Sequence, residues 1–242
     1  METAMRTWGL AGMLVIGLVL SGGVSAKTSF SGNVDVVSRE PSVTAEELNS
    51  LAIQAHGEYQ QIARILGQPG AEKIHVSVED VEISFTNFYR RTIVTGIYHL
   101  KNGQVPLAHE LTHVFTGRGV SEVLSEGVAV YLQERVGKGR VFPNYGNELN
   151  ARLRENSKKW NIPVPRDAYA FAERNINNME QMRPRIISYL MAGSFCRYLI
   201  DDVLGGDVPK FMEIFHNGDF LAIAGKTRDA LMKDWRGTVL KG

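Results

Sequence analysis

The sequence predicts a single α+β domain in which a small β-sheet lobe precedes a mostly helical lobe. Short segments rich in β-branched and aromatic residues fall between residues 74 and 100, as expected of strands. Beyond Pro106 the apolar residues recur at the spacing of amphipathic helices. The chain has 242 residues, of which 44% are hydrophobic, and this composition excludes intrinsic disorder and collagen-like structure.

The first 26 residues have the three parts of a signal peptide. Arg6 supplies a positive charge, Trp8–Leu20 is uncharged and mostly apolar, and Val24–Ala26 is a small-residue cleavage pattern. We expect cleavage after Ala26, leaving residues 27–242 as a secreted or periplasmic domain with no stable membrane insertion. Counted through Val24, the apolar run has 17 residues, so an uncleaved N-terminal anchor is the alternative.

In the first half of the domain we expect one helix and three strands. Lys27–Glu40 lacks helical periodicity and indicates a flexible lead-in or an edge strand. Apolar residues then recur at helical spacing from Ser42 to Leu66, where Gly67 ends the helix. The predicted strands are Ile74–Val78, Val81–Phe85 and Thr92–Leu100.

The second half is expected to be helical, with glycine and proline marking the ends of the helices. Arg140–Gly146 is expected to be a loop and Asn161–Arg166 a connection. The predicted helices are Pro106–Phe115, Ser121–Val136, Glu148–Trp160, Arg185–Asp202, Val208–His216 and Thr227–Leu240.

Charge and cysteine content narrow the possible partners and metal ligands. The formal net charge is +1, which gives no general electrostatic reason to bind nucleic acid or an anionic membrane surface. The one cysteine, Cys196, allows neither an intramolecular disulfide nor a thiolate zinc cage. We expect Cys196 to be a small buried hydrophobic residue, and only His, Asp and Glu remain as protein metal ligands.

An H-E-x-x-H motif lies within the helix predicted after Pro106. His109 and His113 stand four residues apart, so both imidazoles fall on one helical face and can converge on a metal ion, most commonly zinc. Glu110 need not bind the metal. It can instead accept a proton from a water molecule whose pKa the metal lowers.

A catalytic zinc ion usually takes three protein ligands, so a third should follow nearby. The pattern with a third histidine is excluded because Gly119 stands where that histidine is required. Glu122 and Glu126 on the next predicted helix are the candidates. Periodicity favours Glu126, because Ala129 and Val130 follow it at i+3 and i+4 on the face that packs inward.

Two segments resemble the gluzincin metallopeptidases, particularly the bacterial peptidase MA-like domains. They are Ala108–Phe115, which contains the H-E-x-x-H motif, and Leu124–Tyr131, which reads Leu-Ser-Glu-Gly-Val-Ala-Val-Tyr. A third segment, Tyr189–Ile200, is similar to a helix of the same domains, and the resemblance extends over about residues 74–240. It implies a zincin-like catalytic domain with Glu126 as third zinc ligand, and a sheet whose edge strand binds substrate.

Two features depart from the family pattern. The separation of His113 and Glu126 is shorter than in the thermolysin-like and aminopeptidase gluzincins, so the connecting loop must be tight. The Gly-x-Met-Glu-Asn element of the aminopeptidases is absent, and Gly96–Leu100 occupies the expected edge strand. Aminopeptidase specificity is therefore not predicted.

A second catalytic group is expected to stabilise the negative charge that develops on the substrate oxygen. Tyr189 is the first candidate, because it begins the family-like helix and has a donor hydroxyl. The alternative is that Tyr189 only packs in the core. Tyr131 and His99 are weaker candidates.

The motifs together predict a zinc metallopeptidase that acts on a peptide or protein substrate. His109, His113 and Glu126 would bind Zn²⁺, while Glu110 and Tyr189 would be catalytic. One alternative is a non-proteolytic zinc-binding protein that keeps the fold for structure or partner binding. Another is the zinc-dependent hydrolysis of a non-peptide amide.

Overall fold

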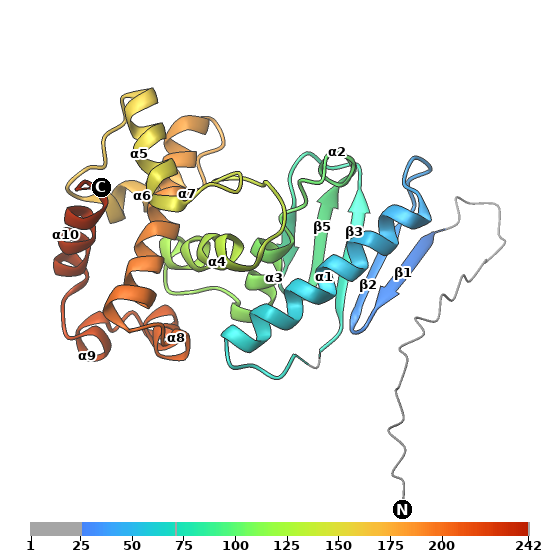
Figure 1. Cartoon of the computed structure of the whole chain (residues 1–242), viewed down its shortest axis with the longest axis horizontal. Helices are drawn as coiled ribbons and strands as arrows, with labels where there is room; N and C mark the ends of the chain where they lie inside the picture. The colour runs from blue at the N-terminus through green and yellow to red at the C-terminus, as the bar shows by residue number, and fades with distance from the viewer. Residues whose placement is uncertain (1–25, 71, 242) are drawn as a thin grey trace, which may run out of the picture.

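The computed structural model describes residues 26–70 and 72–241 (Figure 1). Residues 1–25, which carry nearly all of the predicted signal peptide, lie outside the described part. Within the described ranges, no helix is both long enough and apolar enough to cross a membrane. The predicted α+β class is confirmed, with a mixed sheet at one end of the molecule and a group of helices at the other.

The sheet has five strands in the order β1-β2-β3-β5-β4. The central pairs β2–β3 and β3–β5 are parallel, whereas the outer pairs β1–β2 and β4–β5 are antiparallel. The strands are β1 (Lys27–Ser31), β2 (Val34–Ser38), β3 (Ile74–Glu79), β4 (Phe85–Asn87) and β5 (Thr92–Gly96).

Helix α1 (Ala45–Ile65) connects the parallel strands β2 and β3 and covers one face of the sheet (Figure 1). Alternate residues of β2 are buried, including Val34 and Val36, as a strand with one covered face requires. The start of α1 is fixed by a capping box in which the side chains of Thr44 and Glu47 bond reciprocally to backbone amides. The predicted helix from Ser42 to Leu66 is therefore confirmed with a shift of a few residues at its start.

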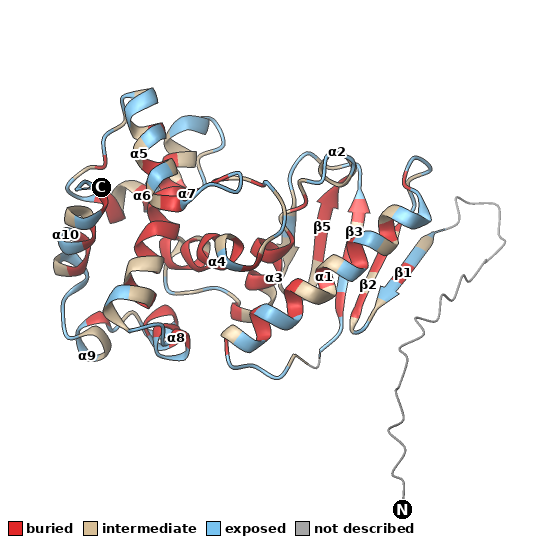
Figure 2. Ribbon diagram, in the orientation of Figure 1, coloured by how far each residue is buried: buried red, intermediate tan, exposed pale blue. Residues whose placement is uncertain are grey.

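The other helices follow β5, and α4 and α7 form the centre of the second lobe. Figure 2 shows buried residues concentrated along these two helices and α3. Their bounds are α2 (Ile97–Lys101), α3 (Leu107–Thr116), α4 (Glu122–Val136), α5 (Leu149–Trp160), α6 (Ala168–Asn175), α7 (Met182–Arg197), the π-helical turn η1 (Tyr198–Val203), α8 (Val208–Asn217), α9 (Phe220–Ala224) and α10 (Arg228–Val239).

Two strand predictions were wrong in position. The strand predicted at Val81–Phe85 begins only at Phe85, and the strand predicted to run to Leu100 ends at Gly96, where α2 begins. A Cβ atom at Gly96 would lie 2.2 Å from the carbonyl oxygen of Val81, so the close approach of that loop requires glycine. The segment Gly96–Leu100 is not an edge strand, because β5 lies between β3 and β4.

The lead-in and the helical lobe also depart from expectation. Residues 27–40 form the β1–β2 hairpin, in which β1 is the expected edge strand and β2 is an interior strand. Helix α7 begins at Met182 rather than Arg185, and helices α6 and α9 were not predicted. Both of these short helices have an aspartate cap, Asp167 and Asp219, whose side chain accepts a backbone hydrogen bond.

We predict that the charge of Glu47 stabilises the contact between α1 and α2. Lys101 Nζ donates to both carboxylate oxygens at 2.7 and 2.8 Å. The hydrogen bonds from Lys101 and from the Thr44 amide lower the pKa of Glu47 to about 2. The substitution Glu47→Gln should therefore reduce the free energy of unfolding at neutral pH by about 1 kcal/mol.

Urea titrations at several pH values test this prediction. Because the folded-state pKa of Glu47 lies below its ordinary value of 4.5, the contribution is complete above pH 4.5 and is lost as the pH falls towards 2. Glu46→Gln removes an exposed charge from the same helical turn and serves as the control. A Glu47→Gln effect that does not shrink between neutral and acidic pH would contradict the prediction.

Candidate metal centre

Helix α3 presents two histidines on its buried face. His109 and His113 are only 7% and 6% exposed, and their ring centroids lie 4.8 Å apart. The two Nε2 atoms are 3.2 Å apart. The spacing of four residues along one helix accounts for this convergence, because it places both side chains on one face about one turn apart.

Glu126 on α4 completes a cluster of three potential ligands. Its Oε2 lies 3.0 Å from His109 Nε2 and 3.5 Å from His113 Nε2. The three ligand atoms all lie within 4.8 Å of one another. Glu122, the other carboxylate considered from sequence, is not part of this cluster.

The loop between α3 and α4 is tight, as the short separation of the two motifs requires. Gly117 ends α3 with φ = 66°, a left-handed value that favours glycine. Ser121 caps α4 by accepting a hydrogen bond from the Leu124 amide, and the Ser125 hydroxyl accepts one from the Gly119 amide. These contacts fix the start of α4 and with it the position of Glu126.

The donor set fits a zinc ion. Two imidazole nitrogens and one carboxylate oxygen are a ligand combination found at catalytic zinc sites. Without a cation, two buried Nε2 atoms 3.2 Å apart can share only one hydrogen bond between them. The Nδ1 atoms of His109 and His113 are buried without a protein hydrogen-bond partner among the described residues, so no hydrogen bond at Nδ1 orients either ring.

The charges of the cluster are strongly coupled. Burial by itself would lower the pKa of His113, but the nearby Glu126 carboxylate outweighs burial and raises it. Burial would raise the pKa of Glu126, but the two histidines hold it well below its usual range. Glu126 is therefore a carboxylate anion, the form that binds a metal.

Glu110 lies beside the cluster and is held by the edge strand of the sheet. The Thr86 hydroxyl on β4 lies 2.7 Å from Glu110 Oε2, to which it donates a hydrogen bond, and 3.0 Å from the Glu110 carbonyl oxygen. Glu110 is 5% exposed and lines a cavity next to His109. Its carboxylate thus faces the cavity with an orientation set by Thr86.

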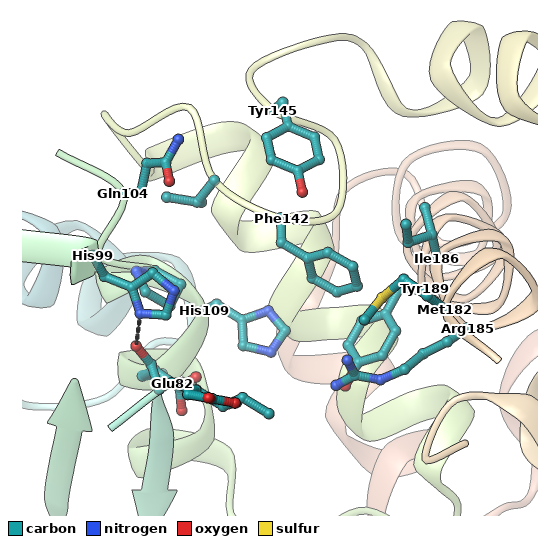
Figure 3. Close-up of a pocket in the computed structure, with 15 residues that line it drawn as sticks. Glu82, His99, Gln104, His109, Phe142, Tyr145, Met182, Arg185, Ile186 and Tyr189 are labelled. Carbon is teal, nitrogen blue, oxygen red and sulfur yellow. Dashed lines mark hydrogen bonds between the residues drawn. The ribbon is translucent and has the colours of Figure 1, made fainter. Parts of the chain in front are cut away.

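The cavity has a volume of about 440 Å³ and separates the sheet from α7. Figure 3 shows His109 between the two walls. Figure 3 shows Glu82, His99 and Gln104 on the sheet side, and Phe142, Tyr145, Met182, Arg185, Ile186 and Tyr189 on the opposite side.

Tyr189 lies on the α7 wall, close to the cluster. Its ring centroid is 6.2 Å from that of His109 and 5.0 Å from that of Phe142. Burial, together with the negative charge of Glu126, raises the pKa of Tyr189 far above its ordinary value. The hydroxyl is therefore protonated at neutral pH and is available as a hydrogen-bond donor.

The two weaker candidates have different surroundings. Tyr131 is absent from the cavity wall, and its hydroxyl donates to Asp201 Oδ1 at 2.8 Å. His99 does line the cavity, where burial lowers its pKa and its Nδ1 lies 3.2 Å from the Ser84 hydroxyl (Figure 3). Cys196 is fully buried, as expected, and burial raises the pKa of its thiol.

Thr86, Phe142 and Arg185 were not predicted as site residues from the sequence. Each joins the site through the tertiary fold. Phe142, from the loop after α4, and Arg185, from the first half of α7, line the cavity, and Thr86 on β4 contacts Glu110. No local motif distinguishes them.

Comparison with known proteins supports the fold. No protein-family model matches the sequence, and no curated protein sequence matches it. An M1 zinc metallopeptidase from Deinococcus radiodurans is similar in structure, with a TM-score of 0.55 and 13% identity over 90% of this chain and 52% of the other. A mutant of that enzyme bound to a Tyr-Ser-Ala substrate gives a TM-score of 0.56 at 13% identity over 89% and 52%.

Yeast LTA4 hydrolase is also similar, with a TM-score of 0.52 and 14% identity over 88% of this chain and 38% of the other. The chain therefore shares the fold of these structures. It spans about half of the length of the Deinococcus enzyme and less of the yeast one. Membership of the peptidase MA-like subgroup stays a prediction.

We predict that Gly127 is required for the close packing of α4 on α7. A Cβ atom at this position would lie 2.5 Å from Cys196 Sγ and 2.6 Å from the Ala192 carbonyl oxygen. Gly127→Ala must move α7 away from α4, at a cost of about 1–3 kcal/mol in the free energy of unfolding.

The matched control is Gly57→Ala in α1, where a Cβ atom meets nothing within 4 Å. Replacing this helical glycine should stabilise the protein by about 0.5–1 kcal/mol. Denaturant unfolding of both variants tests the packing. Similar unfolding free energies for the two variants would show that the α4–α7 contact is looser than described.

Proposed function

We propose that the chain is a zinc-dependent metallopeptidase, with zinc bound by His109, His113 and Glu126. The observation that carries this proposal is the convergence of the three ligand atoms within 4.8 Å at the wall of a cavity that Glu110 also lines. The fold shared with M1 zinc metallopeptidases supports it.

When bound, zinc would supply a Lewis acid that polarises the peptide carbonyl and makes water more acidic. Glu110 then acts as general base, accepting a proton from the attacking water at a carboxylate oxygen and returning it to the nitrogen of the departing amine. Thr86 positions Glu110 by its hydrogen bond to Oε2. Burial excludes bulk water from this carboxylate.

Tyr189 is the second catalytic residue of the proposal. Its protonated hydroxyl would donate a hydrogen bond to the carbonyl oxygen as negative charge develops there. The pKa of Tyr189 is raised, so the hydroxyl keeps its proton across the neutral range. The short distance between the rings of Tyr189 and His109 supports this role.

An extended peptide is the substrate class that the cavity fits. Strand β4 is the edge strand beside Glu110, and an edge strand can pair with an extended backbone. One similar structure contains a Tyr-Ser-Ala substrate. Because Phe85–Asn87 on β4 also lacks the Gly-x-Met-Glu-Asn element, we do not propose aminopeptidase specificity.

The test is the substitution Glu110→Gln. It removes the proposed base but none of the three proposed ligands, so peptide cleavage should fall by about 10²–10⁴-fold while bound zinc is retained. Cleavage of a broad peptide pool is followed by mass spectrometry, and zinc by elemental analysis. Glu155→Gln, an exposed charge on α5, is the control. Equal cleavage by wild type and Glu110→Gln would refute the mechanism, and zinc retention without any turnover would favour the non-proteolytic alternative.

We further propose that the protein is exported and that its signal peptide is cleaved after Ala26. Strand β1 begins at Lys27, the next residue, so cleavage at this point would leave the sheet complete. Mass spectrometry of the exported protein should give Lys27 as the N-terminal residue. A chain that keeps Met1 or Glu2 would indicate the uncleaved anchor instead.

A further inference from the structure

We propose that Arg185 determines specificity at this site by binding a carboxylate group of the substrate. The inference rests on the peptidase function proposed above and adds to it the chemical class of the group that the cavity selects.

Arg185 is the one Lys or Arg among the residues that line the cavity, whereas Glu82 and Glu110 are acidic. Figure 3 shows Arg185 on the α7 wall and Glu82 on the opposite wall, with His109 between them. An anionic group entering the cavity therefore meets favourable side-chain charge on the α7 side, at Arg185.

The guanidinium group is held in one orientation. Its Nε donates to the carbonyl oxygen of Ile176 at 3.1 Å. The guanidinium carbon lies 5.5 Å from the ring centroid of Phe142 and 5.3 Å from that of Tyr189. Arginine packed on aromatic rings keeps its planar edge for two parallel hydrogen bonds, the geometry that matches a carboxylate.

Phe142, one of the two aromatic rings packed against Arg185, lies on a loop that is itself held by hydrogen bonds. Gln133, which is 4% exposed, donates from Nε2 to the Phe142 carbonyl oxygen at 2.8 Å and to Asn144 Oδ1 at 3.1 Å. These buried bonds hold the loop that carries Phe142 against α4. Arg185 is therefore preorganised, so little conformational entropy is lost when it binds an anion.

Arg185 packs on two aromatic rings, but its positive charge has no acidic partner within the described structure. Among the described residues no carboxylate lies within ion-pair distance of it, although Arg135 and Arg197 each pair with an acidic side chain. A half-buried cation without an acidic partner attracts an anionic ligand. Met182 and Ile186, which also line the cavity, add an apolar surface next to that charge.

The group that would bind here is a carboxylate next to an apolar side chain. A peptide can supply this carboxylate from its C-terminus or from the side chains of Asp and Glu. The probes are N-acetylated apolar hexapeptides made as the free acid and as the C-terminal amide. A second pair, both amidated, carries one internal Glu or Gln. Comparison of the two pairs distinguishes the two sources.

Binding is measured by calorimetry on zinc-loaded protein carrying Glu110→Gln, so that turnover does not intervene. In at least one pair, the peptide with the carboxylate should bind at least about tenfold more tightly than its neutral counterpart. Adding Arg185→Gln should bring this ratio close to one. Arg183→Gln removes an exposed charge from the first turn of the same helix and should leave the ratio unchanged.

Arg185→Lys keeps the positive charge without the planar fork, so it should lower the ratio of carboxylate to neutral peptide affinity only in part. This variant replaces Arg185→Gln if Arg185→Gln does not fold. A ratio near one in the parent protein for both pairs, or a ratio undiminished by the Arg185 substitution, would overturn the inference.

Cleavage of the same peptides by otherwise wild-type protein separates this inference from the proposed function. Cleavage with no preference for carboxylate would leave the peptidase function standing and overturn the role of Arg185. Binding that depends on Arg185, with no cleavage of any peptide, would support the carboxylate site and count against the peptidase function.

Discussion

The contact between α3 and α4 at His109, His113 and Glu126 is the constraint on which the rest of the structure depends. Burying two imidazoles and a carboxylate has a desolvation cost, which the groups offset only by interacting with each other or with a cation. Their burial requires α3 and α4 to lie at one fixed separation. Each neighbouring element is then arranged around this pair of helices.

Helix α7 extends the site because it packs closely on α4. Gly127 and Gly193 provide the close approach, since a Cβ atom at Gly193 would lie 2.4 Å from Val130 Cγ1. This packing brings one face of α7 to the cavity, and Arg185 and Tyr189 share that face because they are four residues apart. The proposed catalytic hydroxyl and the proposed carboxylate site are thus separated by one helical turn.

The parts of the site that depend on local sequence could be predicted, and those that depend on tertiary contacts could not. His109 and His113 share a face because of helical periodicity alone, and Glu126 follows after a short loop. The edge strand was misassigned because β4 has only three residues and because Gly96 ends β5 through contact with a distant loop.

The proposed role of Arg185 also could not be predicted from the sequence, because it depends on tertiary contacts. Its environment comes from Ile176 after α6 and from Phe142 after α4, and no spacing within the sequence joins these segments. Helix α6 has an aspartate cap but only eight residues, too few for a clear periodic pattern. The longer helices were found because their periodicity extends over many residues.

The most direct measurement is the zinc content of the purified protein after exhaustive dialysis, with Glu126→Gln and Glu122→Gln as a matched pair. We expect about one zinc ion per chain in the wild type and in Glu122→Gln, and a large loss in Glu126→Gln. A folded wild-type protein that binds no zinc even when zinc is supplied, or a loss confined to Glu122→Gln, would contradict this expectation.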